Sequence, residues 1–238
     1  MFGISLYQQK TVELRPEGRR PFNATNLFHS SGIRHPFTPY LSQVPCSWGG
    51  VYFPEIWREF HQYLIDRLSE RMYNIDTMIV PDSRSNKWTK SWKKFFIEMV
   101  YLRGYVMLYP NYAGFTSLST NHLEVGTHVR RDAVLENEFA AKKALFEVPL
   151  MPLASVDPPS ANGLSLLDLP YGKLPRRRHL PVVDLWGVLE HGTTLMELGL
   201  RRQIELLIDG CKALNGTLDK DEERRLAKCT IPSMGAGV

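Results

Sequence analysis

The amino-acid sequence predicts an α/β domain with a small, mainly parallel sheet and flanking helices. The deciding observation is the order of patterns between residues 77 and 109, where an apolar strand pattern at 77–80 precedes an amphipathic helix and a second strand pattern at 105–109. Both strand patterns stop at a proline, Pro81 and Pro110, as short buried strands often do. Two parallel strands joined by a helix make a β-α-β unit at 77–109.

The helix of this unit is indicated by apolar residues that recur three and four positions apart and therefore share one helix face. Thr89 can cap its start and Gly104 can end it. The residues on the apolar face are Trp92, Phe95, Phe96, Met99 and Val100.

Residues 1–50 are expected to form an irregular arm. Prolines recur too often for long regular elements, and aromatic residues between them favour wrapping of the arm around the domain. The prolines are Pro16, Pro21, Pro36, Pro39 and Pro45.

The α/β domain is expected to span residues 51–210. Helical spacing predicts helices at 54–71 and 133–146, with short strands at 146–151 and 181–186. A proline-rich connection at 152–181 lies between them, and Thr194 with Glu197 has the spacing of a capping box that opens a last helix. Residues 211–238 are expected to be a charged, partly flexible tail.

Composition limits the classes of function. The chain has 238 residues, of which 43% are hydrophobic and 23% charged, and a net charge of +4. This is typical of a globular protein with local anion sites and argues against a nucleic-acid surface. The alternative is that Trp88 and Trp92, within a basic loop, stack single-stranded bases.

Cysteine usage and apolar runs also exclude several classes. Cys46, Cys211 and Cys229 are far apart without a CxxC pair, so neither a disulfide framework nor a zinc site is expected. Cys46 remains a minor candidate for a nucleophile. No signal peptide or membrane-spanning run is visible, so a cytoplasmic location is expected for this chain, with membrane association left to a longer parent protein.

The segment 83–94 carries cations and no acid. Cations at a helix start oppose the helix dipole, whereas an anion is stabilised there. We therefore expect a cradle for phosphate or diphosphate, built from backbone N–H groups, the hydroxyls of Ser83 and Ser85, and neighbouring cations. The alternative is a solvated basic face, since no glycine-rich phosphate fingerprint is present. The cations are Arg84, Lys87, Lys90, Lys93 and Lys94.

A second polar segment follows the strand pattern at 105–109. In an open parallel sheet ligands bind beyond the carboxyl ends of the strands, so both polar segments should leave the same edge and line one crevice. The crevice is expected to contain Asp82, Arg84, Asn86, Lys87, Asn111, Asn121, His122, Glu124 and His128.

The segment 121–128 allows three interpretations. Glu124 or His122 can act as a general base on an acceptor hydroxyl, with the other residue orienting it. His122, Glu124 and His128 can instead form a two-histidine, one-carboxylate metal triad. The third interpretation is a loop whose histidines make ordinary hydrogen bonds.

Two runs, SRSNKWTKSWKKFFIEMVYLRGYVMLYPNY and STNHLEVGTHV, resemble the C-terminal part of large fungal proteins described as glycosyltransferase-like. The similarity extends over about residues 35–187 and includes PCSWGGVYFPEIWREFHQYL and LPVVDLWG. The resemblance implies transfer of a sugar from a nucleotide-activated donor, with the basic loop holding the diphosphate through Arg84, Lys87 and Lys90. It also implies that the chain is part of a larger enzyme.

Metal dependence is left open by the resemblance. Such enzymes often place a divalent metal on an Asp-x-Asp pair, and the only match is Asp219-Lys220-Asp221, which we interpret as a solvated helix face. A second hypothesis for the whole chain is a non-catalytic module that binds a phosphorylated ligand or a partner domain in a larger assembly.

Overall fold

The computed structural model describes residues 1–68, 78–120, 147–150 and 173–213. Within these residues six short strands form one mixed sheet in the order β5-β1-β6-β4-β7-β8. The strands are β1 Gly3–Ser5, β4 Tyr40–Ser42, β5 Gly50–Tyr52, β6 Met107–Tyr109, β7 Val182–Val183 and β8 Leu189–Glu190. A separate hairpin pairs β2 Thr11–Val12 with β3 Arg20–Pro21.

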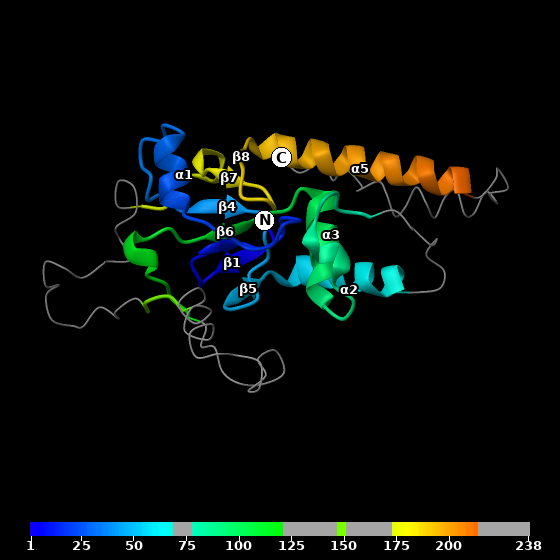
Figure 1. Cartoon of the computed structure of the whole chain (residues 1–238), viewed down its shortest axis with the longest axis horizontal. Helices are drawn as coiled ribbons and strands as arrows, with labels where there is room; N and C mark the ends of the chain where they lie inside the picture. Colours follow the sequence, from blue (N-terminus) through cyan, green and yellow to red (C-terminus); the bar gives the residue numbers. More distant parts are fainter. Residues whose placement is uncertain (69–77, 121–146, 151–172, 214–238) are drawn as a thin grey trace, which may run out of the picture.

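Helices pack alongside this sheet, which confirms the predicted α/β class. In Figure 1, α1 lies at one end of the sheet, α2 and α3 lie at the other, and α5 runs along the side that carries β7 and β8. Their bounds are α1 Ala24–Ser30, α2 Pro54–Leu68, α3 Trp92–Arg103 and α5 Gly192–Ala213, and three short 3-10 turns are η1 Arg84–Lys87, η2 Ala113–Phe115 and η5 Arg177–His179.

Strand directions in the sheet are mixed, whereas a mainly parallel sheet was predicted. β1 pairs with β6 and β4 with β7 in parallel. The pairs β1–β5, β4–β6 and β7–β8 are antiparallel. The parallel pair β1–β6 matters for the site, because the segments that follow both strands leave the sheet at one edge.

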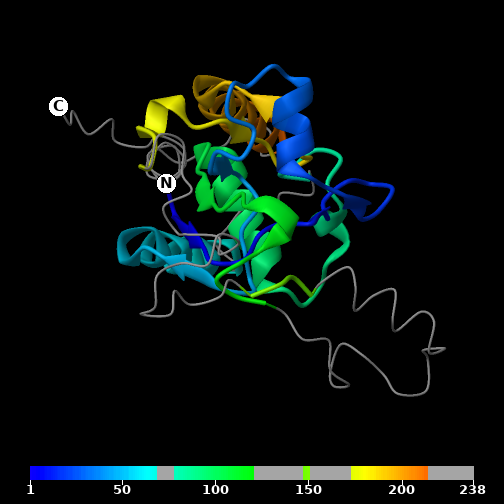
Figure 2. The same ribbon diagram turned by 90° about the vertical axis from the view of Figure 1, so that its left-hand side faces the viewer.

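The N-terminal 50 residues build much of the sheet, so the prediction of an irregular arm is wrong. They supply β1, β4 and α1, the β2–β3 hairpin, and the first residue of β5. Figure 2 shows the hairpin, in dark blue, projecting from the body. Strands of two or three residues are too short to show alternation. Pro21 is the last residue of β3 and Pro39 directly precedes β4, and prolines are tolerated at such strand ends.

The predicted strand at 77–80 is also wrong for its described residues, 78–80, which form no strand. Ile79 and Val80 are buried as predicted, but side chains satisfy their carbonyls. The guanidinium Nε of Arg202 in α5 donates to the Ile79 carbonyl at 3.1 Å, and Asn86 Nδ2 donates to that of Val80 at 2.8 Å. An apolar run can therefore be core without pairing to a neighbour.

Helix α3 is the element that the sequence predicts best. It ends at Gly104, whose φ of 61° lies in the left-handed region, as the predicted glycine C-cap requires. It begins after Ser91, two residues beyond the predicted cap Thr89. Its residues from Phe96 to Leu102 are buried, because α2 and α5 both pack against it.

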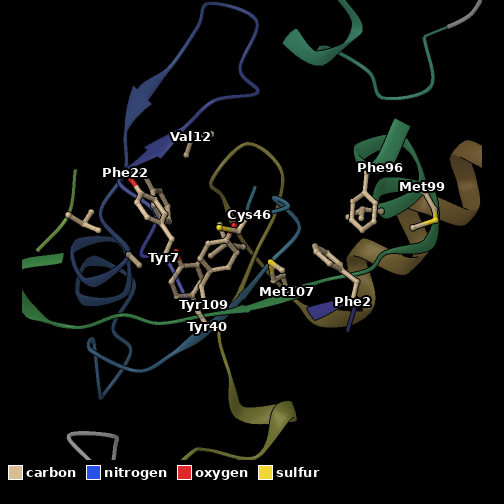
Figure 3. Close-up of a cluster of buried hydrophobic side chains, with 14 of the residues drawn as sticks. Phe2, Tyr7, Val12, Phe22, Tyr40, Cys46, Phe96, Met99, Met107 and Tyr109 are labelled. Carbon is tan, nitrogen blue, oxygen red and sulfur yellow. The ribbon is translucent and has the colours of Figure 1, made fainter. Parts of the chain in front are cut away.

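Aromatic side chains fill the main core. Tyr40 of β4 and Tyr109 of β6 stack with ring centroids 5.5 Å apart, and Phe2, just before β1, meets Phe96 of α3 edge to face at 5.3 Å. Figure 3 shows the tyrosines gathered around Cys46, with Phe2 and Phe96 toward α3. The tyrosine end of this core forms the floor of the candidate site.

Candidate functional site

A small open cavity lies over the tyrosine end of the core. Its enclosed volume is about 30 Å³, and the empty space reaches about 380 Å³ only when the open solvent at its mouth is included. The segment after β1, the crossing segment between β4 and β5, helix α3 and β6 all contribute to its wall. The lining residues are Tyr7, Gln9, Lys10, Thr11, Glu13, Val44, Pro45, Cys46, Ser47, Trp48, Lys93 and Tyr109.

Hydrogen bonds to the backbone fix the crossing segment over the sheet. The hydroxyl of Tyr109 donates to the Val44 carbonyl at 2.8 Å, and that of Tyr52 donates to the Cys46 carbonyl at 2.6 Å. Both tyrosines belong to the sheet, so the cavity wall is held rigidly against the floor.

The segments that follow the parallel strands β1 and β6 are joined at one edge of the sheet. The side-chain amide of Gln8 donates from Nε2 to the Tyr112 carbonyl at 3.0 Å and accepts from the Tyr112 N–H at Oε1 at 2.8 Å. The cavity is lined by Tyr7 and Gln9, which follow β1, and by Tyr109, the last residue of β6, so it lies at the carboxyl ends of this parallel pair. The crevice was predicted instead beyond strands at 77–80 and 105–109, of which the first does not form.

A single carboxylate, Glu13, is surrounded by cations beside the cavity. Lys93 Nζ donates to its Oε1, and the guanidinium of Arg19 lies 4.0 Å from its Oε2. Burial alone would raise the pKa of the Glu13 carboxyl, but the charges of Lys93, Arg19 and Arg84 outweigh burial and lower that pKa below its ordinary value. Lys93, Arg19 and Arg84 thus all act on this one carboxylate.

Gln9 contributes a buried hydrogen-bond acceptor to the cavity wall. Its Nε2 donates to the Thr11 carbonyl at 2.9 Å, which fixes the orientation of the amide. The residue is 6% exposed, and its Oε1 has no hydrogen-bond partner among the residues that the structure describes. Buried acceptors are rarely left in this state.

Cys46 lines the same cavity as a protonated thiol. Burial raises its pKa, and the stabilising contacts with Ser5 and the Trp48 backbone are too weak to reverse this. A nucleophilic cysteine needs a lowered pKa, so the geometry gives no support to the minor interpretation of Cys46 as a nucleophile.

At the start of the predicted cradle, which spans 83–94, residues 82–87 form a compact turn that satisfies its own polar groups. Ser83 Oγ accepts from the Ser85 N–H at 3.3 Å, and the two serine hydroxyls lie 2.7 Å apart and are buried. Asn86 is engaged with the Val80 carbonyl. Asp82, at a left-handed φ of 47°, is exposed and offers its carbonyl to Trp186 Nε1. These serine hydroxyls and the Asn86 amide are thus already committed within the turn.

The cations of the basic loop separate into two groups. Lys87 and Lys90 are exposed. Arg84 and Lys93 instead act on the Glu13 carboxylate, and the Arg84 backbone N–H donates to the Leu14 carbonyl at 2.9 Å, which holds the turn against that segment. Of the cations expected in the phosphate cradle, Arg84 and Lys93 belong to the charge cluster around Glu13.

Asn111 serves as an anchor for the segment after β6. Its Nδ2 donates to the carbonyls of Pro36 at 2.7 Å and Thr38 at 3.2 Å, and its Oδ1 accepts from Thr25 Oγ1 at 3.0 Å. It is 1% exposed. In the described part of the chain no hydrogen bond joins Asn111 to the 82–90 segment.

The remaining predicted site residues, Asn121, His122, Glu124 and His128, lie outside the described residues, as does Asp219-Lys220-Asp221. The predicted opposition of the basic loop and the 121–128 segment therefore stays a prediction. Among residues 1–68, 78–120, 147–150 and 173–213, no group of three or more potential metal ligands occurs. No described helix is long and apolar enough to cross a membrane.

Comparison with known proteins gives no relative: no family model, no curated protein and no solved structure matches the chain. The site is therefore argued from its geometry. Sequence reasoning missed Gln9, Lys10 and Glu13, which lie about 80 residues before Lys93 in the chain. A local pattern could not reveal them, because the fold alone brings these segments together.

Proposed function

We propose that the cavity binds the phosphate groups of a phosphorylated ligand, and that this ligand is a nucleotide-activated sugar used in glycosyl transfer. The observation that carries the first part is the surplus of cations around Glu13 beside the cavity. The second part follows the resemblance to fungal glycosyltransferase-like proteins and depends on the first.

The charge cluster has the composition of an anion site. Like charges held together in a partly buried place repel one another, and the three cations that act on Glu13 outnumber this carboxylate. A bound phosphate or diphosphate would accept charge-assisted hydrogen bonds from such cations, and Arg and Lys are the residues that commonly make them. Lys10 also lines the cavity, but its Nζ donates to the Glu147 carbonyl at 3.1 Å and lies over the Phe115 ring.

The described residues are suited to binding and to stabilising negative charge. Lys93 and Arg84 would stabilise the diphosphate as the bond between it and the sugar carbon breaks. An acceptor hydroxyl would form the new bond to that carbon and give its proton to Glu124 or His122. Glu13 is a poor base, because its pKa is lowered, and burial raises the pKa of both Tyr7 and Cys46.

The experiment is calorimetric titration of inorganic diphosphate into the wild-type chain and into two variants that each lose one lysine charge. Lys93→Met removes the cation beside Glu13, and the matched control Lys94→Met removes the neighbouring charge, which lies over the Phe95 ring. We expect Lys93→Met to weaken diphosphate binding about tenfold or more, equivalent to about 1.4 kcal/mol. Lys94→Met should change the affinity for diphosphate by less than about threefold, because the Lys94 charge acts on the ligand over a longer, more screened distance.

Absence of diphosphate binding by the wild-type chain, or equal losses in the two variants, would overturn the anion site. Catalysis is tested separately by consumption of a panel of nucleotide sugars, with Glu124→Gln as the inactive variant. Equal turnover in Glu124→Gln would exclude that residue as the base.

A non-catalytic anion-binding module is the second candidate. It is favoured by one observation: within the described residues, the carboxyl, thiol and phenol groups of the cavity all have a pKa shifted away from neutrality. Diphosphate binding without turnover of any nucleotide sugar would support this candidate.

A further inference from the structure

We infer that α5 pairs with the α5 helix of a second copy of this chain, with the two helices antiparallel. The surface concerned is an outer stripe of three apolar side chains, Met196, Leu200 and Ile204, which are 61%, 50% and 48% exposed. These residues lie four positions apart, so they follow one line along the helix. The inference does not depend on the proposed anion site.

Another face of α5 is held against α3. Leu195, Gly199 and Gln203 are buried, and Gln203 Nε2 donates to the Leu102 carbonyl at 2.6 Å. A Cβ atom at Gly199 would lie 2.5 Å from the same carbonyl, so the two helices approach closely there. Figure 1 shows α5 running along the outside of the molecule. The outer stripe therefore belongs to a helix that is already fixed in place, which lowers the entropy cost of association.

A row of charged side chains runs beside the outer stripe. Glu197 and Arg201, about one turn apart, are both exposed. Neither forms an ion pair or a side-chain hydrogen bond in the part of the chain that the structure describes. An anionic surface such as a membrane would attract Arg201 but repel Glu197. A reversed copy of the same row is complementary to both residues, because charges that flank an apolar helix contact select the partner and its direction.

One register satisfies the charged row and the outer stripe together. If Glu197 of each copy lies opposite Arg201 of the other, the two-fold axis passes beside Gly199. With a rise of about 1.5 Å per residue, the apolar side chains of the two stripes then alternate along the contact at steps of about 3 Å. Each apolar side chain enters a gap between two side chains of the other copy, as in packed helix pairs.

The contact is small. Residues 192–206 of the two copies overlap in this register, which is about 22 Å of helix. Stable dimers bury about 800 Å² per partner, so we expect a weak dimer with a dissociation constant of about 10–100 μM.

Sedimentation velocity at low ionic strength, from about 1 to about 300 μM chain, tests the apolar part of the contact. We expect the wild-type chain to change from monomer to dimer over this range. Leu200→Lys places a charge in the outer stripe and should leave the chain monomeric throughout. The matched control is Leu68→Lys in α2, at a side chain that is 64% exposed, and it should associate as the wild type does. Far-UV circular dichroism shows whether each variant keeps its helix content.

Two charge-reversal variants test the direction and register. Glu197→Arg and Arg201→Glu each give the row a single sign, so each variant alone should associate at least about tenfold more weakly than the wild type. In an equimolar mixture of the two variants, every positive row can face a negative one. The mixture should therefore form a mixed dimer at least as tightly as the wild type associates.

Three results would overturn the inference. The first is a wild-type chain that stays monomeric at about 300 μM. The second is loss of association in Leu68→Lys equal to that in Leu200→Lys, which would show that the outer stripe is not the contact. The third is a mixture that associates no more strongly than either charge-reversal variant alone, which would show that the two charged rows do not face each other.

Discussion

Two buried carboxylates, Glu98 in α3 and Glu13 beside the cavity, have opposite surroundings. The Glu98 side chain is 2% exposed and accepts from Arg67 Nε and from the Tyr63 hydroxyl, both at 3.1 Å. The Glu13 side chain is 12% exposed and is influenced by three cations, Lys93, Arg19 and Arg84, at the edge of a cavity.

The difference distinguishes an ion pair that holds helices together from a candidate site. At Glu98 the charges balance and the group lies between α2 and α3, so nothing further is required. At Glu13 the cations outnumber the carboxylate, and one of them, Lys93, lines the cavity. Ionisable groups with strongly perturbed pKa values cluster at functional sites. The feature that separates Glu13 from Glu98 is the excess of positive charge beside the cavity.

The largest effect is expected on breaking the balanced pair. Glu98→Leu would leave the Arg67 guanidinium, 19% exposed, and the Tyr63 hydroxyl without their shared acceptor. Removal of one partner from a buried ion pair costs roughly 3–5 kcal/mol, and we expect the lower end because Arg67 can reach water. Urea denaturation measures the loss, and an unchanged affinity for diphosphate in the folded fraction would support a purely structural role.

A smaller effect is expected from Tyr63→Phe, which removes one hydrogen bond to Glu98 and leaves the Arg67 pair intact. A hydrogen bond to a charged group contributes about 1.5–3 kcal/mol, so the free energy of unfolding should fall by an amount within or just below this range. If Tyr63→Phe lowered the free energy of unfolding as much as Glu98→Leu does, the Arg67–Glu98 ion pair would depend on the Tyr63 hydroxyl. That result would contradict the charge balance between Arg67 and Glu98.

The smallest effect concerns acid stability at Glu13. Its folded-state pKa lies below the ordinary value of 4.5, so the carboxylate stabilises the fold above that pH and loses this contribution as the pH falls through the folded pKa. The difference in unfolding free energy between wild type and Glu13→Gln should therefore shrink on acidification below about pH 4.5. Urea midpoints at pH 7 and at pH 3 measure it, and a difference independent of pH would mean that the cations do not act on this carboxylate.

The sequence predicted the parts of the fold that repeat locally. Helix α3 and its end at Gly104 follow from helical spacing and from the conformational freedom of glycine. The three-residue strands β1 and β4 carry no such pattern, and Ile79 and Val80 look like a strand because burial alone makes a segment apolar.

The candidate site was predicted in part. The sequence indicated that the 83–94 segment supplies cations, and the structure brings Arg84 and Lys93 from it to Glu13. The sequence could not indicate which groups lie near these cations, because only the fold brings the segments 9–13 and 44–48 beside Lys93. The hydroxyls of Ser83 and Ser85 were expected to face a ligand, but a short turn has to satisfy its own polar atoms first.

Arg202 connects α5 to the charge cluster by a short series of bonds. Its guanidinium holds the Ile79 carbonyl, the next carbonyl along is held by Asn86, and the turn containing Asn86 also presents Arg84. Side-chain hydrogen bonds to two consecutive backbone carbonyls thus join a long outer helix to the turn that carries Arg84.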